Sequence, residues 1–306
     1  MSATVGSAPP AVEMRYSARR DKARRWANRG VIYAVLLAGA LLMIFPVFWM
    51  YVTSFKKEFY SQGAHMVWFP MLPKYFTLEN YGELLSRAGA KSSGAADDFF
   101  VASANTFIYT AAATLGNILI CAMAGYALAK RRFKGRNVVF ASILATMMIP
   151  GIMVLLPNFV ITMRYLHGYN NFAGLIIPGL ASSFGVFLMR QYMLAIPDEL
   201  IEAAKMDGAG EMWTFFAVVL PLATPILVAY GILLVLGFWN DLLWPLVITK
   251  DLTVLQVALL NLIEIGSQRM GPAMAGAAIS STPLIILFFL VRKQFVAAMT
   301  SGALKG

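Results

Sequence analysis

Six long stretches of the chain contain no Asp, Glu, Lys or Arg. Each is long enough to cross the hydrocarbon core of a membrane, about 30 Å thick, which takes roughly 20 helical residues. A soluble core helix would be shorter, and a β-barrel would show short alternating segments instead. The pattern therefore predicts an all-α integral membrane protein with six transmembrane helices. The six stretches are Gly30–Phe55, Phe99–Ala129, Asn137–Met163, Tyr165–Met189, Met212–Asn240 and Met270–Val291.

Prolines lie inside or at the edges of most of these stretches. Proline would break a soluble helix, but in a membrane bundle neighbouring groups can satisfy the freed carbonyls. Kinked helices are therefore expected. The prolines are Pro46, Pro150, Pro157, Pro178, Pro221, Pro225, Pro245 and Pro283.

Composition supports the membrane interpretation. Hydrophobic residues make up 59% of the 306-residue chain and charged residues only 13%, whereas a soluble domain is nearer a quarter charged. If the N-terminus is cytoplasmic, 17 of the 25 Lys and Arg fall on the cytoplasmic side, as the positive-inside rule requires. We therefore expect both termini in the cytoplasm, with a basic N-terminal segment (1–29), a six-helix domain (30–292) and a C-terminal tail (293–306).

The basic residues indicate topology rather than nucleic-acid binding. The Lys/Arg runs at Arg19–Arg25 and Lys130–Arg136 flank spans, as anchors at the surface of membrane lipid should. Catalytic motifs are missing from the sequence: it has no phosphate-binding GxxxxGK[ST], no HExxH and no GxSxG. The single Cys121 excludes an internal disulfide and a Cys-based metal site. We therefore expect no catalytic residues and no metal ligands in this chain.

The motif FWNDLLWP brings Trp239, Asn240 and Asp241 to the outer end of the fifth span. These residues either reach water at the interface or line the outer mouth of a translocation path. One carboxylate at an edge makes a poor proton relay, and inverted repeats are not evident, which disfavours a secondary transporter. A third alternative is a membrane-embedded enzyme or assembly factor, but the catalytic motifs that an enzyme would need are missing from the sequence. Energy for uphill transport would then come from a partner.

The segment 190–211 is acidic, with five Asp or Glu against two Lys or Arg, whereas the other segments predicted on the cytoplasmic side are basic. Pro197 followed by Asp198 and Glu199 is typical of a helix start, where Asp198 can cap free amides. The helix is expected from Glu199 to about Asp207, with Gly208 as its stop. Acidic residues are common at the start of any exposed helix, so the alternative that this segment is only a solvated connector between two spans stays open.

This short helix has small residues at helical spacing. Leu200, Ala203 and Ala204 are predicted on one stripe, while Glu202 points elsewhere. Such a smooth surface would let the backbone of another protein come close.

The sequence EAAKMDGAGEMWTFFAVVLPLATP, from Glu202 to Pro225, resembles the "EAA" signature of the membrane subunits of bacterial ABC importers. The longer context resembles the carbohydrate-uptake permeases of the MalG type. It consists of FGVFLMRQYMLAIPDELIEAAKMDGAG through the loop, FWNDLLWPL after it, TLENYGELL in the first outer loop and the terminal SGALKG. The resemblance covers Ile32 to Gly306.

The resemblance implies the six-helix fold of a type I ABC importer permease in a bacterial or archaeal plasma membrane. It implies as partners a MalF-like second permease, a MalK-like ATPase dimer that binds the ATP and Mg²⁺, and an extracytoplasmic sugar-binding protein. No cofactor is expected in this chain. The cargo would be a di- or oligosaccharide such as maltose, maltodextrin or trehalose, or alternatively another solute such as glycerol 3-phosphate.

The resemblance also makes the loop 196–211 a "coupling helix" that docks in a cleft of the ATPase. Glu202 would pair with a basic group of the ATPase, Ala203 and Ala204 would fit the cleft wall, and Gly208 would make the turn. Asp207, before that glycine, also matches the signature. Trp239, Asn240 and Asp241 are candidates for the translocation path.

Overall fold

The computed structural model describes residues 11–57, 76–85, 99–265 and 270–303, and these are almost entirely helical. Within these ranges the only extended pairing is an isolated bridge between Lys56 and Phe76. This confirms the prediction of an all-α chain. The structure divides into two units, residues 1–53 and residues 54–306, and each is described by itself.

The described part of the first unit lies in the long helix α1 (Ala11–Ser54), which contains Pro46 and whose last residue belongs to the second unit. Its apolar part, Asn28–Ser54, has 27 residues and is long and apolar enough to cross a membrane. The first predicted span coincides with this part. The described portion of the basic N-terminal segment, from Ala11 onward, is an extension of the same helix.

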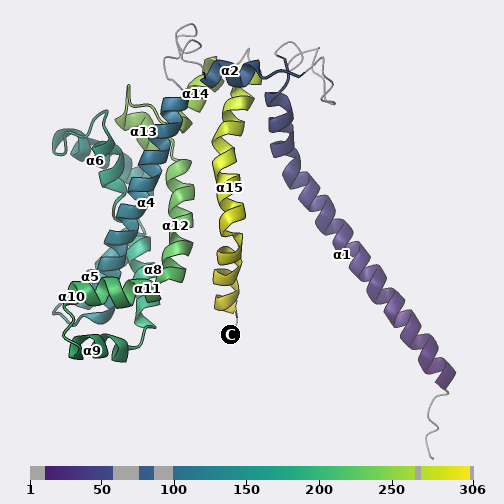
Figure 1. Cartoon of the computed structure of the whole chain (residues 1–306), viewed down its shortest axis with the longest axis horizontal. Helices are drawn as coiled ribbons and strands as arrows, with labels where there is room; N and C mark the ends of the chain where they lie inside the picture. Colours follow the sequence, from purple (N-terminus) through teal and green to yellow (C-terminus); the bar gives the residue numbers. More distant parts are fainter. Residues whose placement is uncertain (1–10, 58–75, 86–98, 266–269, 304–306) are drawn as a thin grey trace, which may run out of the picture. The chain divides into compact units, whose positions relative to one another are not determined.

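The second unit holds the remaining helices, with α4 packed against both α8 and α12 (Figure 1). The elements are α2 (Glu79–Leu85), α4 (Phe99–Lys130), α5 (Arg136–Thr146), α6 (Gly151–Arg164), α7 (Phe172–Ile176), the 3₁₀ turn η3 (Ile177–Gly179), α8 (Ser183–Leu194), α9 (Asp198–Met206), α10 (Glu211–Thr214), the π-helical η4 (Phe215–Val219), α11 (Leu220–Leu222), α12 (Thr224–Trp239), α13 (Leu243–Ile248), α14 (Leu255–Ile265) and α15 (Met270–Ala303).

Three of the six predicted spans are continuous helices and three are bent pairs. The bends are 104° between α5 and α6, 47° between α7–η3 and α8, and 78° between α10–α11 and α12. Pro150 immediately precedes α6, and proline disfavours a helical conformation in the residue before it. Pro225 lies in the first turn of α12, where its missing amide cannot continue the hydrogen bonds of the preceding helix. The described chain thus holds three spans, or six if each bent pair is one, and the expectation of kinked helices is confirmed.

The fourth predicted span differs in its bounds. Helix begins at Phe172 rather than Tyr165 and continues to Leu194 rather than Met189. Asn171 caps α7 by accepting a hydrogen bond from the Gly174 amide at 2.9 Å. Polar capping therefore sets this boundary, which an apolar run alone does not reveal.

Close packing joins α4 to α8. A Cβ atom on Gly125 of α4 would lie 2.6 Å from the Met189 Cβ of α8, so only glycine allows this approach. Gly185 of α8 has a similar role, because its Cβ would lie 2.2 Å from the Tyr230 hydroxyl of α12. Small residues at helix contacts are typical of membrane bundles.

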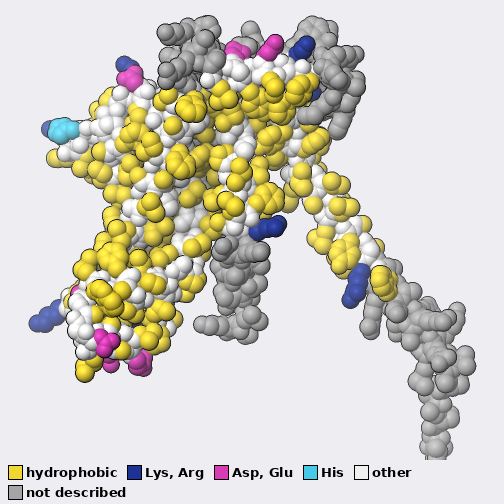
Figure 2. Space-filling view, in the orientation of Figure 1, with side chains coloured by type: hydrophobic (Ala, Val, Ile, Leu, Met, Phe, Trp, Pro, Cys, Tyr) yellow, Lys and Arg dark blue, Asp and Glu magenta, His cyan; other side chains and the backbone are white. Residues whose placement is uncertain are grey.

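The second unit has two ends that matter for function. We call the end with Lys130, α9 and α10 the EAA end, and the end with α2, α13 and α14 the opposite end (Figure 1). Figure 2 shows hydrophobic side chains over the surface between them, and acidic side chains gathered at the two ends. This distribution is that of a protein whose middle lies in lipid.

Candidate functional site

The helix α9 forms the core of the predicted coupling loop. It covers Asp198–Met206, within one residue of the prediction at each end. The prediction that Asp198 caps free amides is wrong, because the N-cap is Pro197 and there is no side-chain cap hydrogen bond. The Asp198 carboxylate instead accepts a hydrogen bond from Lys130 Nζ at 2.7 Å.

A glycine turn ends α9. Gly208 has φ of +83°, in the left-handed region that favours glycine. Its amide donates to the Lys205 carbonyl, and the Ala209 amide donates to the Ala204 carbonyl, both at 2.9 Å. This pair of bonds is a Schellman motif, and it confirms the predicted stop at Gly208.

The predicted stripe of Leu200, Ala203 and Ala204 is divided in the structure. Ala204 is buried together with Ile201, which packs into the hydrophobic core that contains Phe215. Leu200 is 43% exposed and Ala203 is also exposed. The helical period puts residues 201 and 204 on one face and 200 and 203 on the next, so Ala204 holds the helix in place rather than offering a surface.

The other residues of the EAA signature lie on the outer side of the helix. Glu202, Ala203, Asp207 and Gly208 are all exposed. The signature therefore places two carboxylates and the small Ala203 side chain on an exposed surface. Their assignment to ATPase contact stays a prediction.

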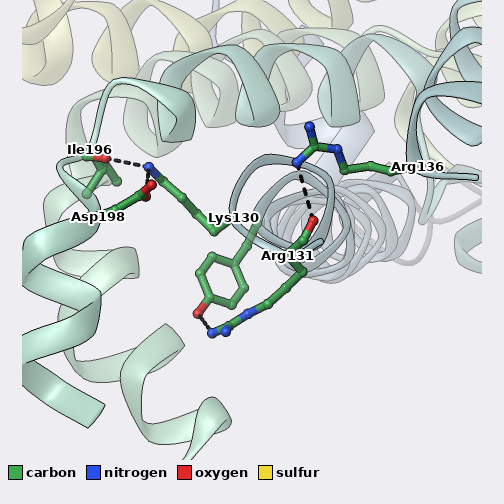
Figure 3. A network of polar contacts seen from close by, with 6 residues as sticks. Lys130, Arg131, Arg136, Ile196 and Asp198 are labelled. Carbon is green, nitrogen blue, oxygen red and sulfur yellow. Dashed lines mark hydrogen bonds and ion pairs between the residues drawn. The ribbon is translucent and has the colours of Figure 1, made fainter. Parts of the chain in front are cut away.

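Lys130, the last residue of α4, fixes the beginning of the loop. Its Nζ donates to the Ile196 carbonyl at 2.5 Å and to Asp198 Oδ1 at 2.7 Å (Figure 3). The Lys130 side chain is only 5% exposed, whereas that of Asp198 is 73% exposed. The hydrogen bond from Lys130, together with its positive charge, lowers the pKa of the Asp198 carboxyl below its usual value.

Arg131 contacts the end of the loop. Its guanidinium forms an ion pair with Glu211, the first residue of α10, and donates to the Tyr126 hydroxyl. Arg136 donates to the Arg131 carbonyl at 3.4 Å (Figure 3). Sequence reasoning treated the basic loop as a lipid anchor and missed these contacts. The opposite charges of segments 130–136 and 196–211 were the signal that could have found them.

The candidate path residues lie at the opposite end and do not share one surface. Trp239 is buried, and its Nε1 donates to the Ser280 carbonyl of α15 at 3.0 Å. Asp241 is half-buried and accepts a hydrogen bond from the Tyr109 hydroxyl at 2.9 Å. Only Asn240 is exposed. Their role in a translocation path stays a prediction.

Residues 96–301 match the family model of the binding-protein-dependent transport system inner membrane component. The chain belongs to this family. The permease is 32% identical over 271 residues to the arabinooligosaccharides transport system permease protein AraQ of Halalkalibacterium halodurans, covering 87% of this chain and 93% of that one. It is 29% identical over 275 residues to the sn-glycerol-3-phosphate transport system permease protein UgpE of Yersinia pestis, covering 88% of this chain and 95% of that one.

A solved structure gives the same result. This permease superimposes on a chain of a bacterial ABC transporter involved in the import of the acidic polysaccharide alginate, with a TM-score of 0.73 and 26% identity. The match covers 89% of this chain and 98% of that chain. The resemblance to carbohydrate ABC permeases is thereby confirmed, and the protein is an inner-membrane component of an ABC transporter.

Proposed function

We propose that this protein is the membrane-spanning subunit of an ATP-driven oligosaccharide importer and that a separate ATPase docks on α9. The observation that carries the proposal is a short helix within a segment held at both ends, at Asp198 and at Glu211, with Glu202 and Ala203 exposed between these anchors. A helix fixed in this way transmits displacement to the bundle, where a flexible loop would dissipate it.

The proposed complex contains a MalF-like second permease, a MalK-like ATPase dimer that binds ATP and Mg²⁺, and an extracytoplasmic binding protein. The EAA end would face the cytoplasm, because the Lys- and Arg-rich loop 130–136 lies there. The cycle requires α9 to bind the open and closed states of the ATPase with different free energies. This permease would contribute half of the translocation path and no catalytic residue.

An oligosaccharide is the favoured cargo. The relative with 32% identity is named as an arabinooligosaccharides transport permease, and the structural neighbour belongs to a transporter involved in the import of a polysaccharide. sn-Glycerol 3-phosphate is the second candidate, because UgpE is 29% identical. The melting temperature of the cognate binding protein, measured with arabinooligosaccharides, maltodextrins, trehalose or glycerol 3-phosphate, distinguishes the two candidate cargoes. A melting shift with the phosphate alone would contradict the oligosaccharide assignment.

The docking assignment is tested by Glu202→Lys in the full complex. We expect membrane insertion to be intact, while co-purification of the ATPase and solute uptake are lost. Glu199→Lys is the matched control, because it makes the same charge change at another exposed glutamate, about one turn earlier on the same helix. Normal uptake by the Glu202→Lys complex would refute ATPase docking at this residue.

A further inference from the structure

The two ends of the EAA segment, defined here as residues 196–211, meet at one point of the bundle. Lys130 contacts the beginning of the segment at Ile196 and Asp198. Arg131 contacts its end at Glu211. Since Lys130 is the last residue of α4 and Arg131 the next in sequence, the segment is attached at both ends to the C-terminus of a single helix.

Lys130 makes the less exposed of the two attachments. Its side chain is 5% exposed, and its two hydrogen-bond partners both belong to the EAA segment. Because both hydrogen bonds of this enclosed side chain end in the EAA segment, they hold the start of the segment to α4, even though the Asp198 carboxylate itself is exposed to solvent. The negative end of the α4 dipole also favours a cation at this position.

At its other end α4 is bonded to the opposite end of the bundle. Thr106 Oγ1 accepts a hydrogen bond from the Leu255 amide of α14 at 2.7 Å. Tyr109 donates to Asp241, which lies just before α13. From Tyr109 to Lys130 the helix rises by about 32 Å at 1.5 Å per residue. One continuous helix therefore joins the EAA segment to α13 and α14.

The geometry points to Lys130 and Arg131 as a clamp through which displacement of the EAA segment passes to α4, with Lys130 as the positioning residue. This inference rests on the proposed function, because it requires the ATPase to move α9. It assigns to the basic loop a task beyond membrane anchoring. It also gives Asp198 a role in the acidic loop that differs from the one proposed for Glu202.

The test uses the complete importer, reconstituted in proteoliposomes with its cognate partners. Lys130→Met removes the ammonium and keeps an unbranched side chain, and Lys130→Arg restores the charge. Lys134→Met is the control, because it makes the same substitution at an exposed cation of the same loop. The readouts are ATPase co-purification, the ATP hydrolysis rate and the number of solute molecules carried per ATP.

We expect the Lys130→Met complex to assemble and hydrolyse ATP, while solute carried per ATP falls by about fivefold or more, the scale of ordinary coupling between sites. Lys130→Arg should recover most of that ratio, and Lys134→Met should not change it. An unchanged ratio in Lys130→Met would overturn the clamp, and so would loss of assembly, which would show a purely structural role. If Glu202→Lys transports normally, the proposed docking fails instead, so the two failures are distinguishable.

Discussion

The Tyr109 hydroxyl donates a hydrogen bond to Asp241 Oδ2 at 2.9 Å, across 132 residues of sequence. Tyr109 is buried in α4, and Asp241 follows the C-terminus of α12. The same carboxylate accepts from the Trp244 amide at 3.4 Å. Asp241 therefore ties α4 to the junction of α12 and α13.

Tyr109→Phe should lower the stability of the purified permease. The substitution removes one donor from a half-buried carboxylate and keeps the ring, at a cost of roughly 0.5–2 kcal/mol. Thermal unfolding in nanodiscs measures the change. Tyr165→Phe is the control, since Tyr165 is 71% exposed. Equal melting temperatures for the two variants would show that the Asp241 contact contributes nothing.

Asn117→Ala should cost more, because Asn117 joins three elements. Its Oδ1 accepts from the Tyr230 hydroxyl at 2.9 Å and its Nδ2 donates to the Gly179 carbonyl at 2.7 Å. The variant removes this acceptor from the buried Tyr230 hydroxyl and this donor from the half-buried Gly179 carbonyl, at a cost of about 2 kcal/mol. The same unfolding measurement with the exposed Asn137→Ala as control checks this prediction. A loss no larger than in the control would contradict it.

Hydropathy alone predicted roughly where the membrane spans lie, because a span needs a long uncharged run whatever its neighbours. It did not predict their directions. Pro150 and Pro225 marked two of the breaks, but the 104° and 78° bends depend on what each half packs against. Helix boundaries set by polar caps, such as Asn171 before α7, also lie outside a hydropathy pattern.

The candidate site was predicted in part. Local chemistry was enough for the position of α9 and for its glycine stop, because propensities and caps act within a few residues. The partner of Asp198 was missed because Lys130 lies 68 residues away in the sequence. The burial of Ala204 was missed for a similar reason, since it depends on how the segment sits on the bundle.

Gly208→Ala should weaken docking of the ATPase. A Cβ at this position meets no atom within 4 Å, so the effect comes from the backbone, whose φ of +83° costs a non-glycine residue about 1–2 kcal/mol. Amide exchange at Ala209, which is bonded to the Ala204 carbonyl, should become faster. Hydrogen exchange and ATPase co-purification measure the two effects.

The matched control is Gly210→Ala. Gly210 has an ordinary φ of −72° and also has open space around its Cβ position. We expect it to resemble the unmodified permease in both measurements. If the two alanine variants behave alike, the left-handed turn is not what holds the end of α9.

Asn170 organises a turn at the opposite end of the bundle. Its Oδ1 accepts hydrogen bonds from the amides of Lys250, Asp251 and Leu252 at 2.8–2.9 Å. Asn170→Gly removes this acceptor but keeps the left-handed backbone, whose φ is 57°. Hydrogen exchange at residues 250–252 should therefore become faster, with the amides of α8 as an internal reference. Unchanged exchange would show that other contacts hold the turn.

Acidification should release the beginning of the EAA segment. The hydrogen bond from Lys130 lowers the pKa of Asp198 in the folded protein. The stability that this contact contributes is therefore fully present above the pKa that Asp198 has in the unfolded chain, and it is lost as the pH falls through the lower pKa of the folded protein. At neutral pH the contact is complete. Faster hydrogen exchange in α9 should thus set in as the pH falls through the ordinary carboxyl range and be complete below the lowered pKa of Asp198. Asp198→Asn should exchange faster already at neutral pH. If hydrogen exchange in α9 were equally fast in Asp198→Asn and in the unmodified protein, both at neutral pH and at acidic pH, the Lys130–Asp198 contact would not stabilise the segment.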